Sequence, residues 1–105
     1  MPNVAPLPDL VLYARPDCSL CDEARNALEL VLADRRERGL AVPNLVERNI
    51  ESDPGWHRTY LERIPVLELG DQRVELVVSV GKVRRLLNES LGDTPQRRSE
   101  LHAET

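Results

Sequence analysis

Short apolar runs alternate with a long amphipathic segment in the first half of this chain, and this alternation limits the possible folds most strongly. Residues 10–13 form an apolar run of the kind found in buried β-strands. Residues 19–38 then show the i, i+4, i+7, i+8 apolar spacing of a helix, and Gly39 follows as a natural terminating residue. Residues 45–50 predict a second strand. Strand, helix and strand in this order predict a right-handed βαβ unit with parallel strands.

The helix over residues 19–38 is expected to bury one apolar face and to end in water. Asp22 and Glu23 in its first turn complement the helix dipole. The charged run over residues 34–38 is interpreted as a solvated helix end. The expected apolar face consists of Leu20, Ala24, Ala27, Leu28, Val31 and Leu32.

The second half of the chain predicts a helix, a hairpin and a closing helix. Asp53 is a good N-cap, and Pro54 is well suited to the first helical position. A Gly-Asp turn separates two strand-like runs, and Ser79 is expected to cap the last helix. The expected elements are a helix from Pro54 to about residue 62, strands over 66–69 and 73–78, and a helix over 80–91. The order βαβαββα predicts an α/β sandwich with a four-stranded mixed sheet and helices on both faces.

The chain length allows one domain, since domains usually hold about 100–200 residues. Residues 1–8 contain three prolines and predict an extended lead-in. The domain is expected to span residues 9–91. Residues 92–105 lack a periodic pattern and predict a flexible tail.

Composition argues against several classes of protein. The chain has 14 basic and 18 acidic residues, a net charge of −4, whereas nucleic-acid binders usually show a basic surplus. Its only aromatic residues are Tyr13, Trp56 and Tyr60, which leaves little on which bases could stack. No apolar stretch approaches the ~18 residues that a membrane span needs, and the first ten residues do not resemble a signal peptide. We expect a cytoplasmic monomer without nucleic-acid or membrane partners.

Two cysteines, Cys18 and Cys21, lie where the first strand meets the first helix. Paired cysteines in the cytoplasm are more often catalytic or metal-binding than structural. Cys18 falls at the expected N-cap, where the first-turn N–H groups and the positive helix end favour a thiolate. The spacing brings the second sulfur within bonding reach of the first. We therefore expect thiol–disulfide exchange, with Cys18 as the nucleophile and Cys21 as the resolving thiol.

Other interpretations of the cysteine pair remain open. A Cys-x-x-Cys sequence is half of many zinc sites, but the chain has no second such motif and no closely spaced histidine pair. His57 and His102 lie far apart in the sequence. Two chains could still share a zinc ion or an iron–sulfur cluster, or the cysteines could be inert. The alternative to an enzyme is therefore a metal-binding module or a non-catalytic interaction scaffold, although no metal site or cofactor is expected within one chain.

Two segments of the chain resemble the glutaredoxin-like branch of the thioredoxin-like superfamily. The first is Leu-Tyr-Ala-Arg-Pro-Asp-Cys-Ser-Leu-Cys over residues 12–21, which looks like the strand-to-active-site segment of glutaredoxins. The second is Tyr-Leu-Glu-Arg-Ile-Pro-Val-Leu over residues 60–67, which is similar to the segment that carries the family's cis-proline. The resemblance covers about residues 9–91 and is nearest to small bacterial glutaredoxin-like proteins. It implies a thioredoxin-like fold.

The resemblance also implies three substrate-binding residues. Arg15 matches the family's basic position three residues before the first cysteine. Ile64 and Pro65 match the cis-proline segment, which would face Cys18. A cis bond there would leave the Ile64 N–H and C=O free to pair with an extended substrate.

Glutathione is expected to bind weakly. Ser-Leu separates the cysteines where glutaredoxins typically have Pro-Tyr, and residues 75–82 lack the Gly-Gly and acidic pair that hold glutathione in that family. Ser79 and Lys82 could contact a glutathione carboxylate at the start of the last helix. An ordinary helix cap and a surface charge also explain these two residues. We therefore expect protein disulfides or other small disulfides as better substrates.

Overall fold

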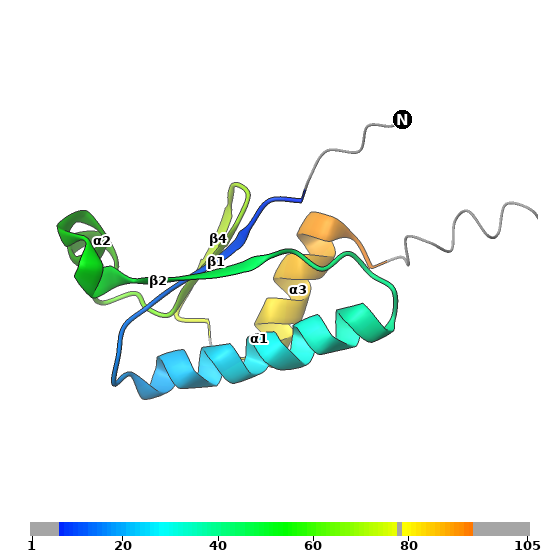
Figure 1. Ribbon diagram of the computed structural model, residues 1–105, viewed down its shortest axis with the longest axis horizontal. Coiled ribbons are helices and arrows are strands. Elements are labelled where there is room, and N and C mark those ends of the chain that lie inside the picture. The colour runs from blue at the N-terminus through cyan, green and yellow to red at the C-terminus, as the bar shows by residue number, and fades with distance from the viewer. Residues whose placement is uncertain (1–6, 78, 94–105) are drawn as a thin grey trace, which may run out of the picture.

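The computed structural model describes residues 7–77 and 79–93, and the predicted alternation of strands and helices is present in it (Figure 1). The N-cap residues expected from the sequence do start their helices: Asp53 accepts the N–H groups of Gly55 and Trp56, and Ser79 accepts that of Lys82. The elements in chain order are β1 (Leu10–Ala14), α1 (Ser19–Glu37), β2 (Leu45–Asn49), the 3-10 helix η1 (Ile50–Ser52), α2 (Pro54–Tyr60), β3 (Val66–Leu69), β4 (Gln72–Glu75) and α3 (Val80–Leu91).

The four strands form one mixed sheet in the order β2-β1-β3-β4. β1 pairs in parallel with β2, as the βαβ unit predicts, and pairs antiparallel with β3. β3 and β4 form the expected antiparallel hairpin, with Gly70 at a φ of 61° in its turn. Glycine suits that position because it has no Cβ to clash in the left-handed region. The α/β sandwich with a four-stranded mixed sheet is thus confirmed.

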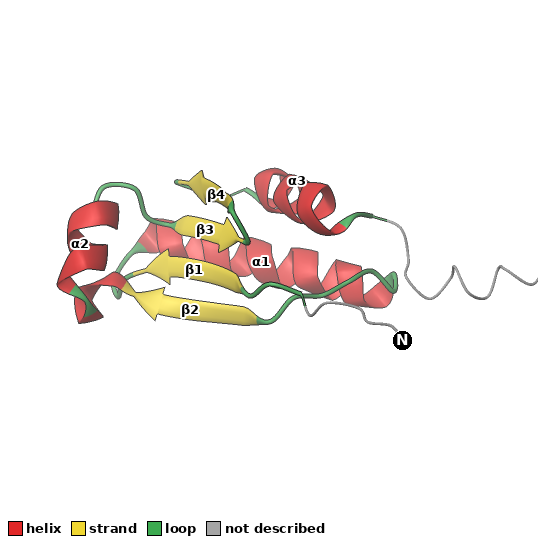
Figure 2. Cartoon of the chain, turned by 90° about the horizontal axis from the view of Figure 1, so that it is seen from above, coloured by secondary structure: helices red, strands yellow, loops and turns green. Residues whose placement is uncertain are grey.

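Helices α1 and α3 pack side by side against one face of the sheet (Figures 1 and 2). The apolar stripe of α1 provides much of the core, because Ala24, Leu28 and Val31 are almost fully buried there. Every residue of β1, the strand next to the centre of the sheet, is buried. Because β1 is buried between β2 and β3, the start of the loop that follows β1 has a fixed position in the fold.

The opposite face of the sheet holds all three aromatic side chains of the chain. Tyr13 of β1 stacks on Tyr60 of α2 with ring centroids 4.4 Å apart, and meets Trp56 edge-on at 5.8 Å. Arg48 lies over the Trp56 ring and Arg73 over the Tyr60 ring, at distances suited to cation–π attraction. These contacts hold α2 at the end of the sheet where β1 and β2 finish (Figure 2).

Some element boundaries differ from those predicted. β4 ends at Glu75, because Leu76 adopts a φ of 52° that no strand can continue through, and Val78 lies outside the described residues. Ile50 leaves β2 and starts η1, where its side chain is fully buried. The expectation that Leu20 lies on the buried face of α1 is wrong: Leu20 is 44% exposed, and the buried stripe instead begins at Cys21, which is fully buried.

The interpretation of residues 34–38 as a wholly solvated helix end is wrong for Arg35, which is only 2% exposed. Its guanidinium donates hydrogen bonds to the carbonyl oxygens of Ala41 and Gly92 and to the Asn88 side chain, at 2.7–3.0 Å. Arg35 is buried because it follows Leu28 by seven residues and Val31 by four, which places it on the buried stripe of α1.

The expected lead-in and tail fall largely outside the described residues, which begin at residue 7 and end at residue 93. Their boundaries, and that of the domain over residues 9–91, therefore stay predictions. Among the described residues, none of the helices is both long and apolar enough to span a membrane.

Candidate functional site

The candidate site lies at the end of the sheet where β1 finishes and β3 begins. Tyr13 pairs with Val66 across these antiparallel strands. Pro65 directly precedes Val66, and Ala14, the last residue of β1, directly follows Tyr13. The loop from β1 leads within four residues to Cys18, so the cysteine pair and the proline segment share one end of the fold.

Cys18 is the N-cap of α1, as predicted. Its backbone is extended, with φ −126° and ψ 106°, and its Sγ accepts a hydrogen bond from the Cys21 N–H at 3.2 Å. Asp17, just before it, adopts a φ of 55°, a conformation that Asp tolerates better than most residues. A sulfur at this position receives a helix N–H group and the positive end of the helix dipole, both of which stabilise negative charge.

Cys21 lies one turn into α1 and is fully buried, whereas Cys18 is only partly buried. The two form a disulfide, with Cα atoms 5.2 Å apart, within the usual range for such a bond. Cys18 is thus the more accessible of the two cysteines, and its role as the attacking thiol stays a prediction. Nothing in the described part of the chain gathers three or more metal-ligating side chains.

The Ile64–Pro65 peptide bond is cis, as the resemblance implied. Both residues are buried, and the Pro65 C=O accepts a hydrogen bond from Val77 N–H at 3.1 Å. The expectation that the Ile64 N–H is free is wrong, because this group donates to the Tyr60 C=O at 3.1 Å. The Ile64 N–H is thus occupied by the turn that follows α2. The Ile64 C=O, in contrast, has no backbone partner among the described residues.

Arg15 lies in the loop between β1 and α1, beside a small open pocket of about 130 Å³. Its Nε is buried and has no hydrogen-bond partner, the one such side-chain atom in the described part of the chain. Buried donors are usually paired, so this unpaired one distinguishes Arg15 among the residues of the candidate site. The pocket is lined by Ala14, Arg15, Pro16, Arg25, Glu47 and Asn49.

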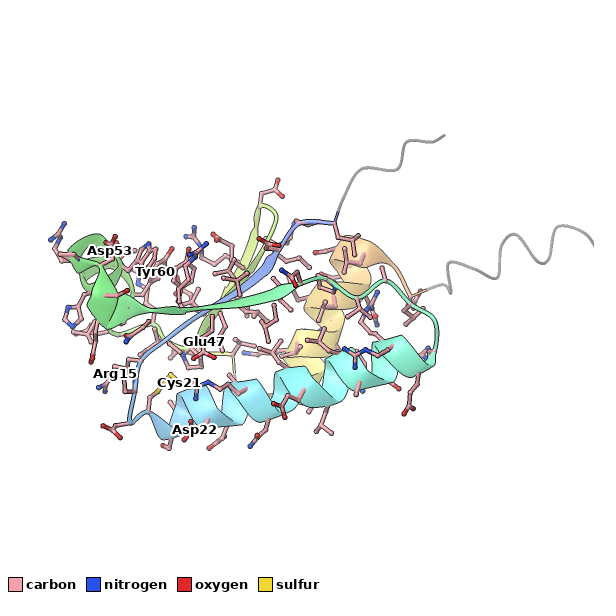
Figure 3. All side chains as sticks on the ribbon, viewed as in Figure 1. Arg15, Cys21, Asp22, Glu47, Asp53 and Tyr60 are labelled. Atoms are coloured by element: carbon pink, nitrogen blue, oxygen red, sulfur yellow. A yellow bond between two sulfur atoms is a disulfide. The ribbon has the colours of Figure 1, made fainter. Side chains whose placement is uncertain are left out.

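Sequence reasoning missed a cluster of three charged residues beside the disulfide. Arg25 donates to both Glu47 carboxylate oxygens, with its Nε 2.9 and 3.0 Å from them, and also binds Asp22. Glu47 holds the pKa of Arg25 above its usual value, chiefly through these hydrogen bonds. Figure 3 shows Cys21, Asp22 and Glu47 at the same end of the molecule as Arg15. The cluster joins the first turns of α1 to β2, and no local sequence pattern signals a contact across 22 positions.

Ser79 and Lys82 occupy the start of α3, where the Ser79 Oγ accepts the Lys82 N–H at 3.1 Å. This is the ordinary capping arrangement. The Lys82 side chain lines a shallow cavity of about 170 Å³ together with residues of β4 and α3, among them Val74 and Leu86. A contact of either residue with glutathione stays a prediction.

A cis-proline segment and a Cys-x-x-Cys helix start at the same end of a β2-β1-β3-β4 sheet define the thioredoxin superfamily as the class of this fold. The sequence profile of the glutaredoxin-like domain (DUF836) matches residues 9–89. The chain therefore belongs to the glutaredoxin-like domain family. A comparison with curated proteins returns no significant match.

Two solved structures are similar to this chain. One is the X-ray structure of protein XcR50 from X. campestris, which is 27% identical, with a TM-score of 0.63, over 76% of this chain and 96% of that one. The other is the solution NMR structure of protein Ne2328 from Nitrosomonas europaea, which is 28% identical, with a TM-score of 0.52, over 71% of this chain and 81% of that one. Both likenesses support the fold assignment.

Proposed function

We propose that this protein is a thiol–disulfide oxidoreductase that reduces protein or small-molecule disulfides. One observation carries the proposal: the Cys18 sulfur caps α1 and accepts the Cys21 N–H, while the Cys21 sulfur lies fully buried behind it. An outer sulfur favoured as thiolate and an inner sulfur within bonding distance are what two-step disulfide exchange requires. We place this chemistry in a cytoplasmic monomer, where such a pair is kept reduced between turnovers.

The reaction begins with the reduced dithiol. The Cys18 thiolate attacks one sulfur of the substrate disulfide, forming a mixed disulfide and releasing the other substrate sulfur as a thiolate. Cys21 then loses its proton and attacks the Cys18 sulfur, which closes the protein disulfide and releases the second substrate thiolate. Two electrons thus pass from the protein dithiol to the substrate, and the Cys21 proton goes to a released thiolate or to water.

Arg15 is proposed to bind an acceptor group of the substrate next to the reacting sulfur. Arg15 lines the pocket and lies in the loop that leads to Cys18, and its buried Nε has no hydrogen-bond partner. Pro65 and the Ile64 C=O are proposed to contact the extended part of the substrate. Weak glutathione binding is part of the same proposal, because the family's acidic pair that would meet the glutathione ammonium is missing from residues 75–82.

Trapping of the mixed disulfide tests the proposal. Cys21→Ser removes the resolving thiol, so a disulfide substrate should remain bound to Cys18, detected by its mass and lost on reduction. Cys18→Ser is the matched control and should trap nothing. Stoichiometric metal in protein purified without chelator, released by thiol modification and accompanied by no disulfide reduction, would instead support the metal-binding alternative.

A further inference from the structure

Leu76 is unusual in both its backbone and its side chain. Its φ of 52° lies in the left-handed region, which large non-glycine residues rarely adopt. Its side chain is 52% exposed, so burial does not explain the choice of leucine. Residues held in such a conformation tend to occur at functional sites, which makes Leu76 a candidate for a role in binding.

The pairing of β3 with β4 explains how Leu76 reaches this conformation. Glu75 pairs with Val66, so the regular ladder would bring Leu76 to Pro65. Instead the Val77 N–H donates to the Pro65 C=O at 3.1 Å, and the Leu76 N–H donates to the Arg63 C=O at 3.0 Å. Leu76 is therefore an extra residue in the ladder. Bulges of this kind redirect side chains at sheet ends, and here Val77 turns into the core while Leu76 is exposed.

A second exposed leucine belongs to the cysteine motif itself. Leu20 lies between Cys18 and Cys21 and is 44% exposed. β3 lies between β1 and β4 in the sheet, so Leu20 follows the strand on one side of Pro65 and Leu76 follows the strand on the other. Two apolar side chains thus occur at the same sheet end as the disulfide, one in the first turn of α1 and one just after β4, and these two segments flank the cis-proline segment.

We propose that Leu20 and Leu76 select disulfides that carry a large apolar side chain next to the reacting cysteine, within an extended protein segment. This proposal rests on the oxidoreductase function proposed above. Each leucine exposes apolar surface that such a side chain would remove from water. Glutathione presents only charged and peptide groups beside its sulfur and would gain nothing from this contact.

The test uses the reduced full-length protein and two synthetic peptide disulfides that differ only in the residue next to cysteine, leucine or serine. Single-turnover measurements give the second-order rate constant for each peptide. Leu76→Asn keeps a residue that tolerates positive φ while removing the apolar surface. Leu76→Gly serves as a second variant of the same kind. Leu30→Gln is the matched control, since Leu30 is exposed in the middle of α1.

We expect the wild type to react roughly fivefold to tenfold faster with the leucine peptide, as apolar contacts of this size allow. Leu76→Asn and Leu76→Gly should reduce this ratio at least threefold without lowering the urea midpoint of unfolding, whereas Leu30→Gln should leave the ratio unchanged. An unchanged ratio in both Leu76 variants, with both peptides reduced, overturns the selectivity but not the oxidoreductase function. Absence of reaction between the wild type and either peptide overturns both.

Discussion

Replacing Arg35 with methionine should destabilise the fold strongly while leaving the cysteine chemistry intact. The Arg35 guanidinium donates to the Ala41 and Gly92 carbonyl oxygens and to the Asn88 side chain, which connects the end of α1 to the end of α3. Methionine fills a similar volume but donates no hydrogen bond. The Ala41 carbonyl and the Asn88 side chain, both in half-buried residues, and the Gly92 carbonyl, in an exposed residue, would then lose this donor.

The magnitude follows from two opposing contributions. Hydrogen bonds from a charged donor contribute about 1.5–3 kcal/mol each, so three could contribute roughly 5–9 kcal/mol. Burial opposes this by penalising the charge, and it is the main cause that lowers the pKa of Arg35 from its usual value. Each neutral acceptor that loses its partner costs about 1–3 kcal/mol, and removal of the buried charge offsets part of the sum, so the net cost of Arg35→Met should be about 2–4 kcal/mol. Most single domains have only about 5–15 kcal/mol of stability.

Urea unfolding followed by circular dichroism measures this cost from the midpoint and slope of the transition. Arg36→Met is the matched control, because the neighbouring Arg36 is exposed and should lose less than about 0.5 kcal/mol. Cys18 lies about 25 Å away along α1, at ~1.5 Å per residue, so its alkylation rate in the folded variant should not change. A loss below about 1 kcal/mol in Arg35→Met would show that the three hydrogen bonds only offset the burial of the charge.

Three further predictions concern other parts of the molecule. In the reduced protein, Cys18 should be alkylated before Cys21, since Cys21 is fully buried; mass mapping of iodoacetamide adducts checks this, and faster labelling of Cys21 would reverse the roles. Burial, followed by the charge of Glu68, raises the pKa of Tyr13 above its usual value of 10.0. Folding therefore favours the neutral phenol, and this stabilisation is complete below pH 10.0 and lost as pH rises through the folded pKa. Unfolding curves should show wild type losing more stability above that pH than Tyr13→Phe, and parallel losses would contradict the reasoning. Asp53→Ala should cost about 1 kcal/mol in the same assay, because it removes the cap of α2, and Asp53→Asn should restore most of that loss.

The sequence alone determined most of the local structure near the candidate site. Each of the local features depends on residues within four positions in the sequence. These features are the N-cap at Cys18, the placement of Cys21 one turn further on, and the cap that Asp53 provides for α2. Such short-range preferences depend on whether a neighbouring side chain can accept a hydrogen bond from the unpaired N–H groups at a helix start. The parallel βαβ unit and the β3–β4 hairpin were also predictable, because chain connectivity and turn chemistry leave few alternatives.

The tertiary structure alone decided how distant segments use their polar groups. Arg35 donates hydrogen bonds to Asn88 and Gly92, which lie 53 and 57 positions further along the chain. Arg25 donates to Glu47, which lies 22 positions further along. Periodicity predicts which face of a helix is buried, but not which acceptors a buried cation will meet there. In the same way, Leu76 is exposed because the Val77 N–H pairs with the Pro65 C=O while the Val77 side chain enters the core. These choices depend on packing between elements, which is fixed only when the sheet and helices assemble.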